Sequence, residues 1–220
     1  MRLTALLGTI VIILSLTEKF YCQEKYDSLI VFVGEKISVV DFPDSTYLDT
    51  LVTEGDTIVT IHTAEDARFI ATYKVIQLIN GNYIQDTISF IVYDHYGRPA
   101  FSKFQNVLLF VRQIEGKYYH VKYQYFEVYR TKNNRWASPY NSFEYDHPNS
   151  HTFTVKPEQI QFVDEISNEI SGMSKKQIRT IYPKPYYRIE KNKAISVYGN
   201  YIEELFLIKQ QGVLKARGYN

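Results

Sequence analysis

Apolar and polar residues alternate along most of the chain between Ser28 and Tyr129, as they do in half-buried β-strands. Two apolar runs, Ser28–Val33 and Ile37–Phe42, flank Gly34-Glu35-Lys36. That arrangement is typical of two strands joined by a tight turn. The pattern therefore predicts a β-rich region that begins at about Ser28.

The longest alternating segment is Arg68–Ile79, which places four of its residues on one face: Phe69, Ala71, Tyr73 and Val75. Asn80-Gly81-Asn82 follows it directly, and these residues tolerate the positive φ that tight hairpins need. We therefore expect a long hairpin whose first strand packs one face on a core.

Further strand patterns recur at Thr57–His62, Tyr83–Tyr93, Asn106–Gln113 and Tyr118–Tyr129, with turn residues between them. Asn106–Gln113 is almost wholly apolar, which predicts a central strand. No helical pattern of crossover length separates these runs, so a parallel α/β sheet is disfavoured. The fold class expected is mainly β, α+β overall, with an antiparallel small barrel or sandwich over residues 23–130.

The bent hairpin around Asn80-Gly81 resembles that of oligonucleotide/oligosaccharide-binding barrels and of netrin-like modules. This resemblance lies in the pattern of strands and turns. It implies a small closed barrel, although the cysteines that staple netrin-like modules are missing here.

The pattern changes after residue 130. Residues 131–153 are polar and rich in turn formers, which predicts a loop or linker. From Glu158 to Ile170 the apolar residues follow a helical stripe, and Ser174-Lys-Lys-Gln177 matches a capping box for a second helix. A third helix is expected over Tyr201–Gln211, so residues 154–220 are predicted to form a small helical C-terminal region.

The N-terminus carries a charged Arg2 and a fourteen-residue apolar run, Leu3–Leu16. Because a membrane span needs about 20 apolar residues, this run suits a secretory signal peptide better. We place cleavage between Cys22 and Gln23, which makes residues 1–22 the signal peptide. An N-terminal anchor helix, or a buried first helix, is the alternative.

The ending Phe20-Tyr21-Cys22-Gln23 resembles that of exported proteins of Bacteroidota type, which implies a periplasmic or secreted protein. A lipoprotein anchored through Cys22 is the second interpretation. Cys22 is the only cysteine, so a chain cut after it has no disulfide and no thiol chemistry. We expect no membrane span in that mature chain.

Charge excludes one class of partner. The chain of 220 residues has 25 basic and 24 acidic side chains, and residues 1–22 contain two and one of these, which leaves 23 of each. A neutral chain has no global field that attracts nucleic acid, so no nucleic-acid partner is expected.

Histidine and aspartate mark one candidate site. The tripeptide Tyr-Asp-His occurs twice, with Asp94 and His95 in the first copy and Asp146 and His147 in the second. If the copies met in space, two Asp-His pairs could perform acid–base chemistry or bind a divalent metal. Each copy also lies at an expected turn, where Asp commonly caps backbone amides.

His147 and His151 are four apart, but Pro148 between them disfavours the helix that a shared metal would need.

The Tyr-rich strand is the other candidate site. In Tyr118–Tyr129, strict alternation places Tyr119, Tyr123 and Tyr125 on one face. Exposed, this row would offer a rigid surface to a protein, a peptide or a glycan. Buried, it would be the core layer that the preceding apolar strand needs, which is the interpretation the pattern favours.

No hydrolase elbow, Ser-x-x-Lys motif or phosphate loop is present, and no cofactor is predicted. The first hypothesis is an exported, noncatalytic binding or envelope-associated module with an unknown ligand. The alternatives are a periplasmic enzyme or metal-binding protein using Asp94, His95, Asp146 and His147, and a subunit of a surface assembly joined through a sheet edge.

Overall fold

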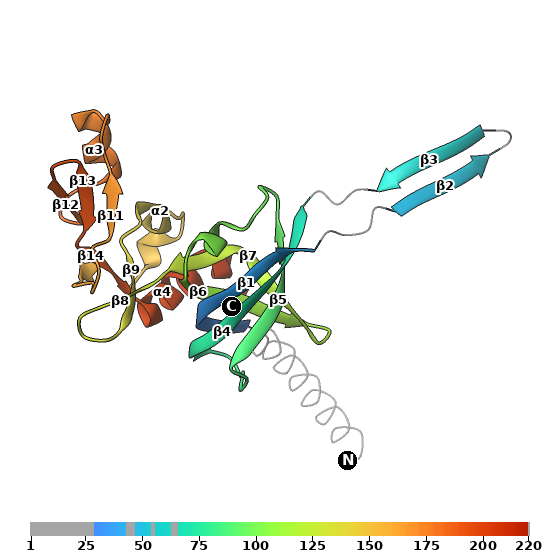
Figure 1. The fold of residues 1–220 in the computed structure, drawn as a ribbon, viewed down its shortest axis with the longest axis horizontal. Coiled ribbons are helices and arrows are strands. Elements are labelled where there is room, and N and C mark those ends of the chain that lie inside the picture. The colour runs from blue at the N-terminus through green and yellow to red at the C-terminus, as the bar shows by residue number, and fades with distance from the viewer. Residues whose placement is uncertain (1–28, 43–46, 54–55, 63–65, 220) are drawn as a thin grey trace, which may run out of the picture.

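The computed structural model describes residues 29–42, 47–53, 56–62 and 66–219. The predicted signal peptide and the Cys22–Gln23 junction lie outside these residues. The architecture is mainly β, as the sequence pattern predicts, and five of its strands form a closed barrel (Figure 1).

The barrel strands follow the order β1-β4-β5-β7-β6 around the cylinder. Neighbouring strands are antiparallel except for β5 and β7, which run parallel. A short 3₁₀ helix, η1, connects β5 to β6. The bounds are β1 Leu29–Asp41, β4 Ala67–Asn80, β5 Thr87–Asp94, η1 Ala100–Lys103, β6 Asn106–Ile114 and β7 Lys117–Glu127.

The tight turn predicted at Gly34-Glu35-Lys36 is wrong, because β1 runs through these residues as one long strand. Its first half pairs with β6 and most of its length pairs with β4, with register shifts on both sides of Gly34-Glu35-Lys36. A Cβ on Gly34 would lie 2.9 Å from the Phe32 ring and 3.0 Å from the Tyr73 ring. The glycine therefore allows a close approach inside the barrel rather than a chain reversal.

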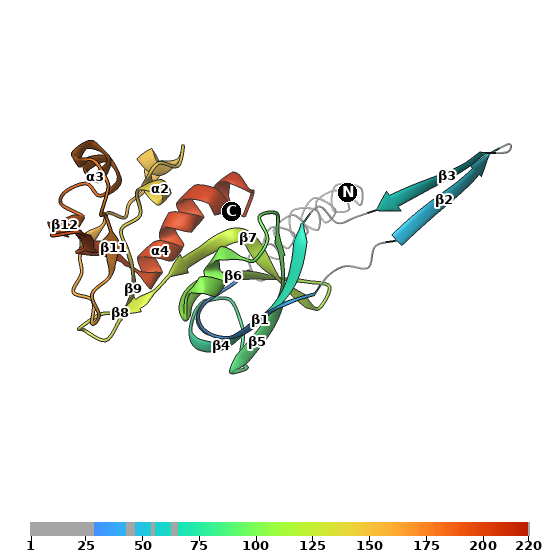
Figure 2. The same ribbon diagram turned by 45° about the horizontal axis from the view of Figure 1, so that its top comes forward.

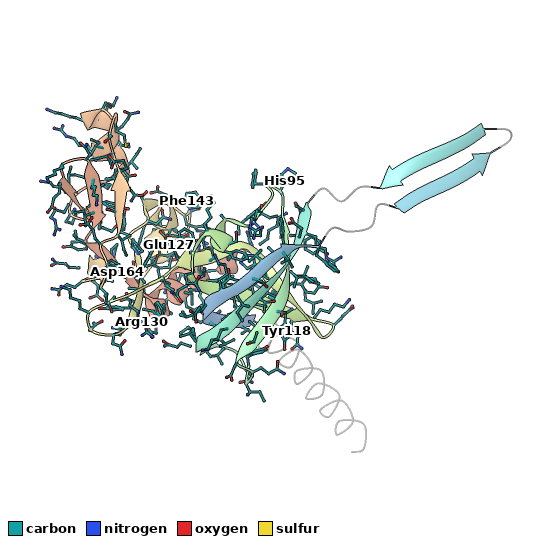
Figure 3. All side chains as sticks on the ribbon, in the orientation of Figure 1. His95, Tyr118, Glu127, Arg130, Phe143 and Asp164 are labelled. Carbon is teal, nitrogen blue, oxygen red and sulfur yellow. The ribbon has the colours of Figure 1, made fainter. Side chains whose placement is uncertain are left out.

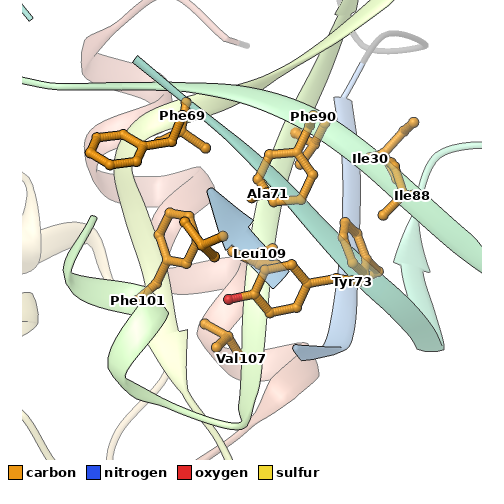
Figure 4. Close-up of a cluster of buried hydrophobic side chains, with 13 residues drawn as sticks. Ile30, Phe69, Ala71, Tyr73, Ile88, Phe90, Phe101, Val107 and Leu109 are labelled. Carbon is orange, nitrogen blue, oxygen red and sulfur yellow. The ribbon is translucent and has the colours of Figure 1, made fainter. Parts of the chain in front are cut away.

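Two apolar clusters cover the two faces of the barrel wall. The barrel interior holds large rings, among them Phe69, Tyr73, Phe90 and Phe101 (Figure 4). The outer face of β6 contributes Leu108 and Phe110 to a second cluster, which includes residues of helix α4, Ile202–Lys209. Figure 2 shows this helix next to the barrel. Since β6 is buried on both faces, the prediction of a central strand is confirmed.

The remainder of the C-terminal part combines short strands and short helices. One sheet has the order β10-β14-β9-β8 and another the order β11-β13-β12. The bounds are β8 Tyr129–Arg130, β9 Trp136–Pro139, α2 Ser142–Tyr145, η2 Ser150–Thr152, β10 Glu158–Gln159, β11 Ser167–Glu169, α3 Lys175–Ile181, β12 Tyr187–Glu190, β13 Lys193–Ser196, β14 Tyr198–Tyr201 and η3 Gln210–Leu214.

The helix expected over Glu158–Ile170 is wrong, because that segment contributes β10 and β11 instead. The two later helices are confirmed. Helix α3 begins at the Ser174–Gln177 capping box, and α4 follows Tyr201. The segment 131–153, expected to be a loop, contains β9 and α2.

Strands β2, Tyr47–Thr53, and β3, Asp56–His62, pair as a separate antiparallel hairpin.

Candidate functional site

Strand β7 carries an irregularity at its centre. Leu109 pairs with Tyr125 and Val111 pairs with His120, so four residues of β7, Val121 to Gln124, lie opposite the single Phe110. Tyr123, inside this bulge, has φ of 67°, which is rare for a bulky side chain and marks a functional candidate. The bulge also changes which residues face inward along the strand.

Before the bulge, Tyr118 and His120 face the barrel interior, where they contact aromatic rings. After it, Tyr125 packs against the same interior cluster, while Phe126 joins the outer one. The prediction that Tyr119, Tyr123 and Tyr125 form one row is therefore wrong. Three extra residues on one strand shift the alternation by an odd number, which separates Tyr119 from Tyr125, while Tyr123 lies in the bulge itself.

A cleft of about 570 Å³ opens beyond the bulge, between the end of β7 and the C-terminal sheets. Figure 3 shows two of its lining residues, Glu127 and Phe143, between the barrel and the C-terminal part. We call it the tyrosine cleft because six tyrosines line it: Tyr123, Tyr125, Tyr129, Tyr140, Tyr182 and Tyr187. Two of the three tyrosines singled out from the sequence, Tyr123 and Tyr125, are among them.

Contacts between aromatic side chains order the far wall of this cleft. The rings of Tyr140 and Tyr186 stack with centroids 3.8 Å apart and planes inclined by 15°. Tyr187 donates a hydrogen bond to the Tyr140 carbonyl at 2.7 Å, and its ring meets the Tyr182 ring edge-on at 5.1 Å. The wall is therefore pre-organised, which lowers the entropy lost when a ligand binds.

Glu127 is the acidic group of the cleft that comes from β7. Its carboxylate is half-buried and accepts a hydrogen bond from the Tyr129 hydroxyl at 2.9 Å. Burial raises the pKa of Glu127 above its ordinary value. Burial also raises the pKa of Tyr187 to about 12, with a smaller contribution from the charge of Glu127, so this phenol stays neutral at physiological pH.

A second cavity of about 310 Å³ shares Tyr123, Phe143 and Glu144 with the tyrosine cleft. Between the two lies a buried ion pair, in which Lys209 Nζ is 2.6 Å from both carboxylate oxygens of Glu144. The same ammonium lies 4.5 Å from the Phe126 ring centroid. This pair ties α4 to α2 and neutralises the charge of Glu144.

The first Asp-His pair lies at the turn after β5. Asp94 is buried and accepts a hydrogen bond from the backbone amide of Tyr96 at 2.9 Å, which is a turn-capping role. His95 Nδ1 is 3.5 Å from Asp66, whose other oxygen is 2.5 Å from Lys122 Nζ. The backbone amide of His95 points to the Tyr123 hydroxyl at 3.4 Å.

The second pair lies at the end of α2. Asp146 is exposed and follows the last residue of that helix, and His147 Nδ1 accepts a hydrogen bond from the Asn149 amide at 3.1 Å. His147 lines the second cavity. Within the described ranges, which include all four residues, no three His, Cys, Asp or Glu side chains form a group that could hold a metal ion. The two pairs therefore do not meet as one metal centre.

Several cleft residues were not predicted as site residues. Glu127 and Tyr129 continue the alternation of Tyr123 and Tyr125, so the sequence contained a signal for them. Tyr140, Tyr182 and Tyr187 come from turn-rich or short-strand segments far along the chain. No local pattern brings these three to the end of β7, because pairing among the short C-terminal strands does so.

Comparison with protein-family models, with curated proteins and with solved structures finds no match to this chain. Among the described helices, none combines the length and the apolar character that crossing a membrane requires.

Proposed function

We propose that this protein is an exported, noncatalytic binding module that takes its ligand in the tyrosine cleft. The observation that carries the proposal is the convergence of six tyrosines on one cleft of about 570 Å³, beside a closed barrel. Tyrosines are rigid, amphipathic contact residues, and pockets of this size commonly bind ligands. The ligand is a protein, a peptide or a glycan.

The barrel topology supports the same proposal. Five strands in the order β1-β4-β5-β7-β6, with one parallel pair, agree with the resemblance to oligonucleotide/oligosaccharide-binding barrels. We infer a barrel that serves as a scaffold, with recognition at its junction with the C-terminal part. Acid–base chemistry by Asp94, His95, Asp146 and His147 has weaker support, since Asp94 caps a turn and Asp146 ends a helix.

Binding by the cleft is tested with arrays of peptides and glycans probed with residues 23–220. Tyr140→Ala removes one wall of the cleft and should weaken any ligand at least tenfold, the loss typical of a central aromatic contact. Tyr119→Ala is the matched control, because Tyr119 is also half-buried but does not line the cleft. Equal affinities of the two variants would contradict binding at this site.

Export is proposed from the N-terminal sequence alone. The intact mass of the protein released by its native host should correspond to a chain beginning at Gln23. A mass that includes residues 1–22 would refute the cleavage, and a lipid attached to Cys22 would favour the lipoprotein alternative.

A further inference from the structure

Glu127 has no compensating cation in the described part of the chain. Among the described residues its one hydrogen bond comes from Tyr129, whereas an ionised carboxylate can accept about four. The other carboxylate of the cleft, Glu144, is paired with Lys209. An ionised, half-buried carboxylate without a cationic partner is unfavourable for the folded protein, and a bound cation would offset this cost.

The net charge of the cleft also favours a cationic ligand. Among its described lining residues there is no lysine, arginine or histidine. Glu127 and Glu144 contribute −2, and Lys209, which contacts Glu144 from behind the wall, contributes +1, so the net charge is −1. One monovalent cation would neutralise the site.

Aromatic side chains line the cleft beside this carboxylate. The Tyr129 hydroxyl donates a hydrogen bond to it at 2.9 Å, and Tyr125 and Tyr187 line the same cleft. Neutral phenol rings attract cations through their faces, and an adjacent carboxylate adds a full opposite charge. Rings and carboxylate together form the kind of site that recognises an ammonium group.

We propose that the tyrosine cleft binds a peptide or protein through a lysine side chain, whose ammonium group sits against Glu127 among the surrounding tyrosines. This inference rests on the proposed binding function. A lysine fits better than a quaternary amine because serine and asparagine side chains also line the cleft and can accept its N–H donors. Its long aliphatic stem can lie along the rings while the ammonium reaches a half-buried carboxylate.

The volume of the cleft agrees with a peptide. About 570 Å³ exceeds the space that one lysine side chain fills, so backbone and neighbouring residues of a ligand can enter as well. An amino sugar also carries an ammonium, but it holds that group directly on its ring. It therefore lacks the flexible aliphatic stem by which a lysine ammonium can reach a half-buried carboxylate.

The test is calorimetric titration of residues 23–220 with the capped peptide Gly-Gly-Lys-Gly-Gly and three analogues. In the analogues norleucine, acetyl-lysine or arginine replaces lysine, and a glucosamine dimer and tetramethylammonium are titrated separately. We expect the lysine peptide to bind at least tenfold more tightly than the norleucine and acetyl-lysine peptides. Glu127→Gln should abolish this preference, and Glu115→Gln, at an exposed turn residue that does not line the cleft, should keep it.

Each other outcome has a defined meaning. Equal binding of the lysine and norleucine peptides, or an unchanged preference in Glu127→Gln, overturns the ammonium site but leaves the binding module intact. Tighter binding of the arginine peptide, of the glucosamine dimer or of tetramethylammonium replaces lysine with that ligand class. If no probe binds but a ligand from the arrays does, and depends on Tyr140, only the lysine inference fails. If no array ligand depends on Tyr140 either, the cleft is not the binding site.

Discussion

The ring of His120 reaches along its own strand to the backbone carbonyl of Gln124, with 2.9 Å between Nε2 and the oxygen. Because a carbonyl only accepts, Nε2 carries the proton and donates it. The same ring lies 4.8 Å from the Phe101 ring inside the barrel. His120 therefore closes the bulge that contains Tyr123 and anchors it to the core.

This role predicts a pH dependence of stability. Burial lowers the pKa of His120 to about 4, from 6.5 in an unfolded chain. The unfolded chain takes up a proton near pH 6.5 and the folded chain only near pH 4. The stabilisation is therefore complete above about pH 6.5 and is lost as the pH falls through 4, by at most about 3 kcal/mol.

Urea unfolding of the mature chain at a series of pH values measures this effect. His120→Gln keeps an amide donor for the Gln124 carbonyl but does not titrate. The variant should show a flatter dependence between pH 6.5 and 4 than the wild type. Equal slopes in both proteins would exclude His120 as the cause.

Tyr125 is expected to be a structural residue as well as a cleft residue. Its ring is half-buried and lies 6.0 Å from the Phe101 ring and 6.3 Å from the Phe104 ring. Tyr125→Ala should lower the free energy of unfolding by about 2 kcal/mol, less than a fully buried aromatic would. Denaturant melts give this value directly. A midpoint like that of the wild type would mean that the ring contributes nothing to the core.

Tyr123 should behave differently, because 40% of it is exposed and its backbone is left-handed. Tyr123→Ala is expected to change stability by less than about 1 kcal/mol. Tyr123→Gly should be more stable than Tyr123→Ala by up to about 1 kcal/mol, since glycine adopts positive φ without strain. Comparing the two melts isolates the backbone contribution. A less stable glycine variant would show that the bulge relaxes when the ring is removed.

The barrel was predictable from sequence because its signals are local. The alternation of Arg68–Ile79, the Asn80-Gly81 hairpin and the apolar Asn106–Gln113 each determine a strand or a turn without help from distant residues. Gly81 has φ of 86°, as the hairpin prediction required. Gly34 misled the prediction because a glycine needed for close packing has the same sequence signature as a glycine in a turn.

The cleft was only partly predictable, because two long-range effects decide it. The bulge at Tyr123 contains no glycine that would mark its positive φ, so strict alternation was assumed. The expected helix at Glu158–Ile170 failed for a related reason. Ile160 and Phe162 both pack on a cluster around Ala137, which is an alternation of period two, and the edge of β14 pairs with Glu158–Gln159. Tertiary pairing overrode a weak helical stripe.

The Lys209–Glu144 pair predicts a large loss of stability when one partner is removed. Its burial lowers the pKa of Lys209, partly offset by the charge of Glu144. Lys209→Met would leave the carboxylate unpaired beside Phe126 and should destabilise the protein by about 3 kcal/mol. Adding Glu144→Gln to the same chain removes the stranded charge and should recover part of the loss. A double variant as unstable as the single one would contradict this account of the pair.

Glu127→Gln should increase the stability of the protein and weaken its recognition of a lysine side chain. Burial raises its pKa, so the folded protein holds the proton more tightly than the unfolded chain does. Its contribution to stability is therefore present below the unfolded pKa of about 4.5 and is lost as the pH rises through the higher folded pKa. At pH 7, Glu127→Gln should be more stable than the wild type by about 1 kcal/mol, because it keeps an acceptor for Tyr129 and removes the charge.

The same substitution should remove the stabilisation that a bound lysine peptide provides. A ligand that binds only the folded state adds RT ln(1 + [L]/Kd) to the free energy of unfolding and so raises the melting temperature. Thermal melts at pH 7 with and without the capped Gly-Gly-Lys-Gly-Gly peptide should show a rise for the wild type and none for the variant. A variant that is less stable without peptide would indicate that the ionised Glu127 serves the fold. If the variant still gains stability from the peptide, the lysine ammonium does not bind at Glu127.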